Sequence, residues 1–305
     1  MNDRFDCIII GAGPAGLTAA LYLARFRRRV LVVHDGTARA LRIPQTHNVP
    51  GYADGVAGPA LIDRMTAHAA AYGATILPGR VEVLAADDGG YACTLADCRT
   101  VRGRSVILAT GILLNQVPLA HDAHEAAIDA GILRYCAVCD AYEHIDKAIG
   151  VIGCDESGVA QAMFLRRYSE NITLIPRHFS ELTDGDRRAL FMAGVAVVDQ
   201  AMIDLDPQAD AMQLWLEGSL EPLRFDVVYP ALGTRPRTEL ALALGLRVGD
   251  DGCLPATAPA GTDAPGFFAA GDVVAGLDQI SVAMGHGAIA ATKAHAWLRD
   301  VAGEI

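Results

Sequence analysis

The chain has 305 residues, of which 52% are hydrophobic and 20% are charged, and its formal net charge is −11. This composition excludes a disordered chain, and the acidic balance disfavours nucleic acid or an anionic membrane as the main partner. No hydrophobic run approaches the roughly 20 residues that cross a membrane, and the start of the chain does not resemble a secretory signal. Seven cysteines in a chain of this length indicate a reducing compartment, so we expect a cytoplasmic protein.

The first predicted unit is a strand, a glycine turn and a helix. Residues 7–10 (CIII) have the pattern of a buried strand, the turn Gly11-x-Gly13-x-x-Gly16 follows, and a helical pattern extends to residue 26. This order is the dinucleotide-binding fingerprint, in which the glycines allow the backbone to approach a pyrophosphate closely. The helix N-terminus offers free N–H groups and the positive end of its dipole to the same group.

A second strand and a β-meander complete this unit. The stretch RVLVV forms the strand, and Asp35 follows it where an acid would hold a ribose hydroxyl, with His34 as the alternative. Alternating stretches between residues 81 and 111 then predict a meander, with Asp88-Gly89 as a hairpin signal.

The same unit recurs between residues 147 and 175. The stretch KAIGVIG is a strand, a glycine turn follows, and NITLI is the next strand. From Gly11 to Val30 and from Gly153 to Ile172 the distance is nineteen residues in both copies. The repeat therefore indicates two nucleotide-type domains.

We expect an α/β fold with two Rossmann-like, three-layer domains, the second inserted in the first and each carrying a β-meander. Residues 1–113 and 240–305 form the first domain, and residues 114–239 form the second. Near the end of the chain, FFAAGD predicts a strand that leads into a turn, and a small-residue helix follows from about Ser281 to Leu298.

Cys136 and Cys139 form a Cys-x-x-Cys pair in the stretch YCAVCDAYE. A zinc site needs a second pair, and Cys93 and Cys98 have four residues between them instead of two, so we expect no metal. A structural disulfide and two unrelated core cysteines are further alternatives. A redox dithiol is favoured, and Asp140 next to it either moves the proton that thiol–disulfide exchange requires or is an acid at a helix start.

Four motifs occur in order: GAGPAG at 11–16, ILATG at 107–111, CAVCD at 136–140 and FFAAGD at 267–272. The glycine fingerprint alone is weak, but the four together resemble the low-molecular-weight thioredoxin reductase family of FAD-dependent pyridine nucleotide-disulfide oxidoreductases. The resemblance covers essentially the whole chain. It implies that the first domain binds FAD and that the second is an NAD(P)H-binding-like domain that carries the cysteine pair.

The resemblance also assigns residues to the FAD site. Asn48 would lie beside the flavin, Asp272 would bond the ribityl chain, and Gln279 would lie next to the isoalloxazine; a turn residue, a turn acid and a solvated cap are the respective alternatives. The full set that it implies is Gly11, Gly13, Pro14, Ala15, Gly16, His34, Asp35, Asn48, Val81, Thr110, Gly111, Gly271, Asp272, Gln279 and Ile280.

The resemblance gives the cysteines separate roles. Cys139 would exchange electrons with FAD, Cys136 would attack the substrate disulfide, and Asp140 would be the acid–base residue. It further implies a thioredoxin-like protein or a small dithiol or disulfide as substrate, and a homodimer.

The second glycine turn departs from the family pattern. It reads Gly153-Cys154-Asp155-Glu156-Ser157-Gly158, so that Asp155 takes the place of the middle glycine. Two like charges 4 Å apart at an effective dielectric constant of about 20 repel by about 4 kcal/mol, or nearly three decades of affinity, before screening. Gly153, Ser157 and Gly158 are thus a possible remnant of an NADP site.

Arg177 follows the second strand of this copy at the position that corresponds to Asp35. A basic residue there suits a 2′-phosphate better than a bare ribose, which favours NADPH over NADH. A solvated surface arginine is the alternative interpretation of Arg177. The turn, which argues against binding of any nicotinamide cofactor, is the stronger of the two indications. We therefore expect a weakened or lost nicotinamide site.

Three functions remain. The first is a flavin-dependent disulfide reductase that takes electrons from NADPH or another donor such as ferredoxin. The second is a dithiol oxidase that passes electrons through FAD to oxygen; such members of the family usually have a histidine after the cysteine pair, so Asp140 favours the reductase. The third is a non-enzymatic redox sensor.

Overall fold

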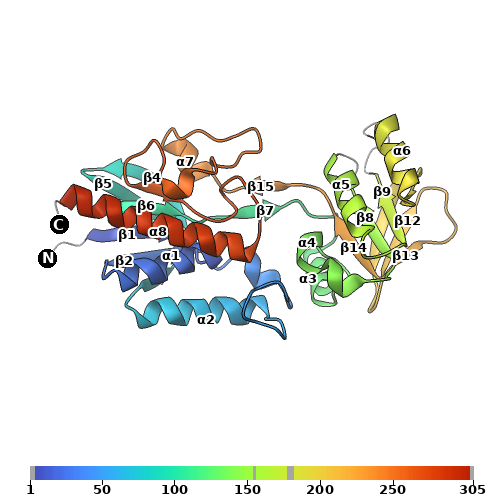
Figure 1. Cartoon of the computed structure of the whole chain (residues 1–305), viewed down its shortest axis with the longest axis horizontal. Coiled ribbons are helices and arrows are strands. Elements are labelled where there is room, and N and C mark those ends of the chain that lie inside the picture. Colours follow the sequence, from blue (N-terminus) through green and yellow to red (C-terminus); the bar gives the residue numbers. More distant parts are fainter. Residues whose placement is uncertain (1–3, 154–155, 177–181, 303–305) are drawn as a thin grey trace. The chain divides into compact units, whose positions relative to one another are not determined.

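The chain forms two compact units (Figure 1), and the computed structural model describes residues 4–153, 156–176 and 182–302. The first unit comprises the described residues up to Gln45, Val49–Leu113, and those from Arg235 onward. The second comprises Thr46–Asn48 and Leu114–Thr234. The segment 235–239, which the sequence places with the inserted domain, thus lies in the first unit.

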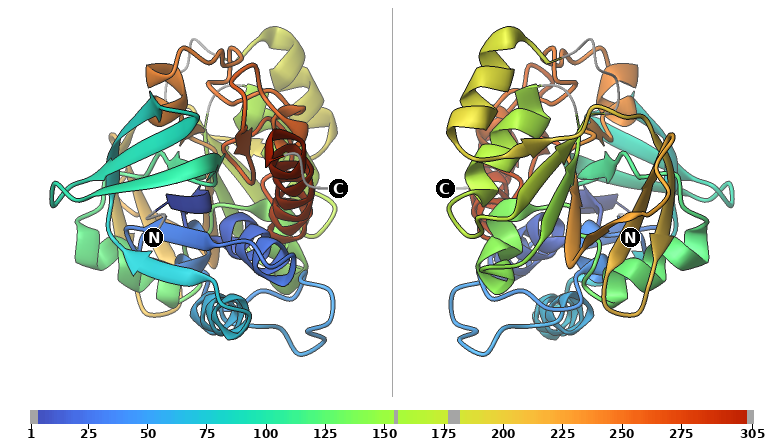
Figure 2. Two further views of the ribbon diagram at one scale, coloured as in Figure 1. Left: turned by 90° about the vertical axis from the view of Figure 1, so that its left-hand side faces the viewer. Right: turned by 90° about the vertical axis from the view of Figure 1, so that its right-hand side faces the viewer.

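The first unit contains a sheet that, in the described residues, has seven strands in the order β3-β2-β1-β6-β5-β4, with β16 paired to β6. Strands β1, β2, β3, β6 and β16 pair in parallel, whereas β4, β5 and β6 form an antiparallel meander, which is teal in Figure 2. The bounds are β1 (Arg4–Ile10), β2 (Val30–His34), β3 (Thr75–Pro78), β4 (Val81–Asp87), β5 (Gly90–Leu95), β6 (Thr100–Leu108) and β16 (Phe267–Ala269). The predicted Asp88-Gly89 hairpin is confirmed, because Asp87 pairs with Gly90.

Helices cover this sheet, and α8 packs along α1 (Figure 1). Small residues make the close packing possible: a Cβ on Gly287 of α8 would overlap the carbonyl oxygen of Ala15 in α1. Helix α8 begins one residue before the predicted Ser281 and extends four residues beyond Leu298. The bounds are α1 (Pro14–Arg25), η1 (Arg39–Arg42), α2 (Gly58–Ala71), α7 (Glu239–Ala243), η4 (Ala258–Ala260) and α8 (Ile280–Ala302).

The second unit has a parallel sheet in the order β10-β9-β8-β14 and a separate antiparallel sheet, β11-β12-β13. Its strands are β8 (Ile149–Ile152), β9 (Ile172–Ile175), β10 (Ala196–Val197), β11 (Met202–Pro207), β12 (Met212–Leu216), β13 (Leu223–Phe225) and β14 (Val227–Pro230). Its helices are α3 (His121–Asp129), α4 (Ala137–Asp140), η2 (Ala141–His144), α5 (Glu156–Leu165) and α6 (Asp184–Met192). The two segments that connect the units pair as β7 (Ile112–Leu114) and β15 (Thr234–Pro236).

The repeat seen in the sequence is present in the structure. Strand β2 starts at Val30 and β9 at Ile172, each nineteen residues after the first turn glycine of its unit. Both units therefore have a Rossmann-like strand–turn–helix–strand core, and the fold is α/β. Helix α5 ends at Leu165, three residues before the predicted Tyr168, because the backbone there tightens into i→i+3 hydrogen bonds.

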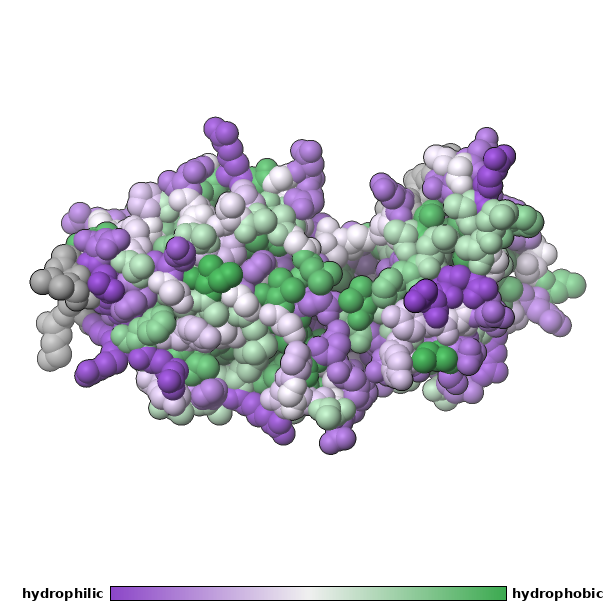
Figure 3. Space-filling model, viewed as in Figure 1, coloured by the Kyte–Doolittle hydropathy of each residue, from purple (hydrophilic) through white to green (hydrophobic). Residues whose placement is uncertain are grey.

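The surface mixes both kinds of residue. On the face shown in Figure 3, hydrophilic residues lie between hydrophobic ones in both units. Among the described helices, none combines the length and the apolar character needed to cross a membrane.

Candidate active site

Two glycines of the first turn are required by packing. Gly11 has φ +114°, and a Cβ on it would overlap the carbonyl oxygen of Ala109, which follows β6. A Cβ on Gly16 would overlap the carbonyl oxygen of Gly11. These two glycines let strand, turn and helix approach one another closely.

Gly13, the middle glycine of the turn, differs from its neighbours. Its φ of −80° suits any residue, and no heavy atom lies within 4 Å of a Cβ built on it. It precedes α1, which starts with Pro14, has no acidic residue in its first turn and has no side-chain cap. Open space in front of an uncapped helix N-terminus fits a bound pyrophosphate, which the backbone must approach closely.

The Gly-Asp motif and the start of α8 lie beside this turn. Gly271 has φ +81°, and a Cβ on it would lie 2.9 Å from the Cβ of Ala15. Gln279 directly precedes α8, its N–H donates to the carbonyl of Leu277 at 2.9 Å, and Ile280 is the first helical residue. The structure therefore brings together the turn and the last motif, which are more than 250 residues apart in the sequence.

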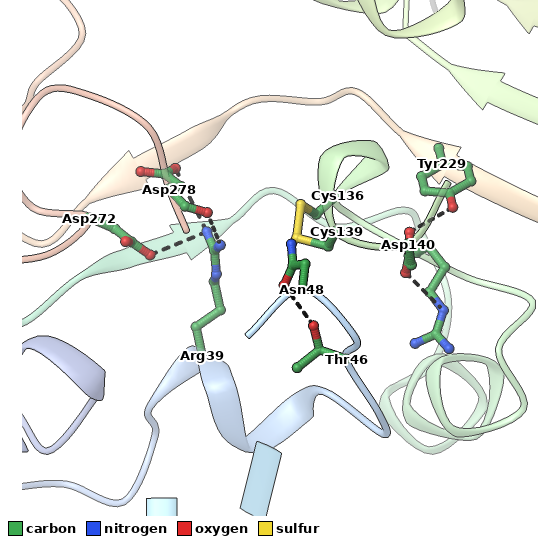
Figure 4. Close-up of a disulfide and its surroundings, with 10 residues drawn as sticks. Arg39, Thr46, Asn48, Cys136, Cys139, Asp140, Tyr229, Asp272 and Asp278 are labelled. Carbon is green, nitrogen blue, oxygen red and sulfur yellow. Dashed lines mark hydrogen bonds and ion pairs between the residues drawn. A yellow bond between two sulfur atoms is a disulfide. The ribbon is translucent and has the colours of Figure 1, made fainter. Parts of the chain in front are cut away.

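Arg39 holds the two carboxylates of this region (Figure 4). Its guanidinium lies 3.4 Å from Asp272 and 3.7 Å from Asp278, and it also donates to the Asp278 carbonyl at 3.0 Å. Burial raises the pKa of Asp272, and burial together with the neighbouring Asp272 charge raises the pKa of Asp278 to about 6. The sequence did not indicate Arg39 or Asp278, because nothing local to either residue announces a partner so distant in the chain.

Asp35 follows His34, the last residue of β2, and its carboxylate is already bonded. Oδ1 accepts from the Thr37 N–H at 3.1 Å and from the Thr37 hydroxyl at 2.6 Å, and Oδ2 accepts from Arg237 at 2.7 Å. Burial opposes ionisation, but the donors from Thr37 and Arg237 outweigh it and lower the pKa of Asp35 to about 2. A carboxylate has about four acceptor positions, so roughly one remains for a ribose hydroxyl.

Arg237 also ties the ATG segment to the returning chain. The Thr110 hydroxyl donates to the Arg237 carbonyl at 2.7 Å, and the Arg237 N–H donates to the Gly111 carbonyl at 2.9 Å. Val81 is the first residue of β4 and is buried in the core of the first unit. Asn48, by contrast, groups with the second unit, where its side-chain oxygen accepts from Thr46 at 2.9 Å.

The cysteine pair is a disulfide in the second unit (Figure 4). Cys136 is the N-cap of α4, the Cys139 N–H donates to the Cys136 carbonyl at 3.0 Å, and the two Cα atoms are 5.3 Å apart. Burial raises the pKa of the Cys7 and Cys93 thiols to about 12, so these stay protonated at neutral pH. Within the described ranges, no group of three His, Cys, Asp or Glu side chains could hold a metal ion.

Asp140, the last residue of α4, is largely buried next to the disulfide. Its Oδ1 accepts from the Tyr229 hydroxyl at 2.7 Å (Figure 4). Its Oδ2 lies 3.3 Å from Nε of Arg134. Burial raises the pKa of Asp140 to about 6, although Tyr229 and Arg134 both favour the carboxylate. A carboxyl group that titrates near neutrality can give and take protons under physiological conditions. Tyr229 and Arg134 were not predicted, although the carboxyl end of a parallel strand such as β14 is where site residues gather.

The second glycine turn repeats the packing of the first. A Cβ on Gly153 would lie 2.8 Å from the carbonyl oxygen of Ala231, and a Cβ on Gly158 would lie 2.8 Å from the carbonyl carbon of Gly153. Ser157 lies in the first turn of α5, next to Glu156, its first residue. Cys154, Asp155 and Arg177 lie outside the described residues.

The chain is similar to known proteins over its whole length. Residues 5–287 match the family described as pyridine nucleotide-disulphide oxidoreductase. A thioredoxin reductase from Streptomyces coelicolor is 32% identical, over 100% of this chain and 97% of its own length. The crystal structure of HlmI has a TM-score of 0.88 at 31% identity, covering 99% of this chain and 96% of that one. A thioredoxin reductase from Streptococcus pyogenes has a TM-score of 0.89 at 26% identity, covering 98% and 100%.

Proposed function

Since the chain belongs to the pyridine nucleotide-disulphide oxidoreductase family and is a thioredoxin reductase-like disulfide oxidoreductase, we propose that it moves electron pairs between FAD in the first unit and the Cys136–Cys139 disulfide. The observation that carries this proposal is the disulfide itself, which lies directly before a buried carboxyl group whose pKa is about 6. The two-electron couple of a dithiol and a disulfide needs such a group to supply and remove protons.

The first unit supplies the residues for FAD, which the thioredoxin reductase family binds. Gly13 and the N-terminus of α1 would take the pyrophosphate, Asp272 the ribityl chain, and Gln279 with Ile280 the isoalloxazine. The open space in front of Gly13 supports this assignment. When bound, FAD supplies the two-electron chemistry that the side chains of the protein lack.

The two cysteines would divide the work. Cys136 would attack the substrate disulfide, and Cys139 would exchange the electron pair with FAD. Asp140 would hold the proton that the departing thiolate takes up. We propose a thioredoxin-like protein or a small dithiol or disulfide as substrate. The family resemblance supports a homodimer, which sedimentation would test.

The second glycine turn bears on the electron donor. The second turn keeps the two packing glycines but has Asp155 in the middle and Glu156 at the helix start, so we propose that its affinity for NADPH is low. A dithiol oxidase is therefore the second candidate. In that function electrons would enter through Cys136 and Cys139 and leave through FAD to oxygen.

An anaerobic titration of the purified protein separates these functions. NADPH, NADH and dithiothreitol are added separately while the flavin absorbance is followed. Bleaching by dithiothreitol and not by micromolar NADPH is the expected result, and its reversal by air with one hydrogen peroxide per dithiol identifies the oxidase. Rapid bleaching by micromolar NADPH would instead identify an ordinary NADPH-dependent reductase. A protein that neither bleaches nor turns over any dithiol or disulfide would be a sensor.

A further inference from the structure

Two side chains from neighbouring segments converge on Asp140. Tyr229 lies in β14, has no exposed surface and donates its hydroxyl to Oδ1 at 2.7 Å. Arg134 lies in the segment that pairs with the other edge of this strand, because its N–H donates to the Val228 carbonyl at 2.9 Å. Its side chain is 18% exposed and that of Asp140 is 17% exposed, so the 3.3 Å ion pair between them is shielded from water.

The two groups meet different oxygens of the carboxylate, which fixes its orientation. A buried tyrosine in a strand cannot follow a carboxylate that rotates, because its ring is held by the core of the second unit. Both the hydroxyl donor and the guanidinium charge stabilise the ionised form and oppose the effect of burial. Burial raises the pKa of Asp140, and these two residues limit that rise.

We propose that Tyr229 and Arg134 are positioning residues of the thiol–disulfide step, which hold the Asp140 carboxyl group in one orientation and set the pH range in which it donates its proton. This proposal rests on the acid–base role of Asp140 proposed above. In this role both residues act through Asp140 and take no part in the bond exchange at the sulfur atoms.

Other charged groups face the same place. Glu143 of η2 lies near Asp140, raises its pKa and is itself paired with His47 at 2.9 Å. The His144 ring lies edge-on to the Tyr229 ring, with centroids 6.0 Å apart, and burial lowers the pKa of His144. Glu143 opposes the Tyr229 hydroxyl donor and the Arg134 charge, so removing either of these leaves burial and Glu143 to raise the pKa of Asp140 further.

The electron pair passes from the substrate to the protein through a mixed disulfide. A substrate thiolate attacks one sulfur of the Cys136–Cys139 disulfide, a new S–S bond forms, and the old S–S bond breaks with its electron pair on the other sulfur. Protonated Asp140 gives its proton to that sulfur. The second thiol of the substrate then gives its proton to the Asp140 carboxylate and attacks the first substrate sulfur, so that the mixed S–S bond breaks with its electron pair on the protein sulfur. The oxidised substrate leaves with its own S–S bond, and the protein disulfide has gained two electrons.

The test follows single-turnover oxidation of dithiothreitol by excess oxidised holoenzyme, without oxygen. Formation of oxidised dithiothreitol is measured between pH 5 and pH 9, and the rate is divided by the thiolate concentration at each pH. This corrected rate should fall as pH rises through the pKa of Asp140. In Tyr229→Phe the midpoint of the fall should move up by about one pH unit, and the low-pH rate should drop several-fold.

Arg134→Gln should also move the midpoint to higher pH. Arg134→Lys keeps the charge, so its midpoint should stay close to that of the parent. Tyr91→Phe is the matched control: Tyr91 is a buried tyrosine of the first unit whose hydroxyl donates to the Pro265 carbonyl at 2.7 Å. It should lower stability without moving the midpoint. A midpoint unchanged in Tyr229→Phe, or moved equally in Tyr91→Phe, would overturn the positioning role.

Asp140→Asn separates this inference from the role on which it rests. It should make the corrected rate low and independent of pH. If Asp140→Asn leaves the profile unchanged, the acid–base role of Asp140 is wrong and the positioning role falls with it. If Asp140→Asn flattens the profile but Tyr229→Phe does not shift it, only the positioning role is wrong.

Discussion

The two glycine turns of this chain have the same packing but different middles. In the first turn, Gly11 and Gly16 remove side chains that would overlap backbone atoms, and Gly153 and Gly158 do so in the second. Each pair lets a strand, a turn and a helix close on one another. The conservation of this packing within one chain explains how both units keep a Rossmann-like core.

The middle position of the first turn is not constrained by packing in this way. Nothing lies within 4 Å of a Cβ on Gly13, and α1 has no acid in its first turn. The second copy has Asp155 at this position in the sequence, and α5 begins with Glu156. The outer glycines therefore serve the fold, whereas a glycine in the middle is needed only where an anionic ligand must approach the backbone.

Exchanging the middle residue should have the largest effect. In Gly13→Asp the first turn receives the carboxylate of the second, which would face the pyrophosphate of FAD. A repulsion of up to about 4 kcal/mol weakens binding by up to nearly three decades. We expect a folded protein that purifies without flavin, measured as the ratio of flavin to protein absorbance and checked by circular dichroism.

Gly185→Asp is the matched control for this variant. Gly185 lies in α6 of the second unit, and a Cβ on it would meet only the Thr183 hydroxyl, at 3.5 Å. This protein should stay yellow. A yellow Gly13→Asp protein with unchanged FAD affinity would mean that the pyrophosphate does not bind at the first turn.

The reverse exchange should have a smaller effect in the opposite direction. In Asp155→Gly the second turn receives the middle glycine of the first, whereas Glu156 stays unchanged. We expect NADPH to bind at least about tenfold more tightly, since part of the charge repulsion is removed. The measurement is the concentration dependence of flavin bleaching by NADPH in anaerobic stopped-flow experiments.

Asp155→Asn separates charge from size, because it keeps the side chain and removes the carboxylate. An affinity between those of the parent and Asp155→Gly would show that both matter. If the parent already binds NADPH at micromolar concentration and Asp155→Gly does not improve the affinity, the residue in the middle of the turn does not limit nicotinamide binding.

Most of the fold was predictable because it follows from local pattern. Hydrophobic strand patterns and the glycine spacing predict the strand–turn–helix units, and Asp88-Gly89 predicts the hairpin between β4 and β5. The end of α5 was not predictable, because the last turn tightens at Leu165 through backbone geometry that the side chains do not reveal. The boundary between the two units at 234/235 could not be predicted from local pattern either, because it depends on contacts that the returning chain makes.

The site was predictable only where its residues belong to motifs. The disulfide pair and Asp140 are adjacent in sequence and could be seen together. Arg39 and Tyr229 could not, because each meets its carboxylate through the fold and has no local pattern around it. Asp35 was seen, but its occupation by Arg237 was not, since that partner is 202 residues away.

The smallest effect is expected from the Asp35–Arg237 ion pair at the end of β2. In the sequence, Arg177 takes the position of Asp35 in the second copy. Arg237→Gln should lower the free energy of unfolding at pH 7 by about 1 kcal/mol, because it removes a partly exposed, hydrogen-bonded ion pair. The pKa of Asp35 is depressed to about 2 from an ordinary 3.8, so its contribution is present above about pH 4 and is lost as the pH falls towards 2. Urea unfolding at several pH values should therefore show a difference in stability from the parent that shrinks in acid.

Arg235→Gln is the control for this variant, because it removes an exposed arginine two residues earlier, and it should show no such difference in stability. If Arg237→Gln keeps full stability but loses FAD affinity, the arginine serves the adenosine end of the cofactor and not the fold.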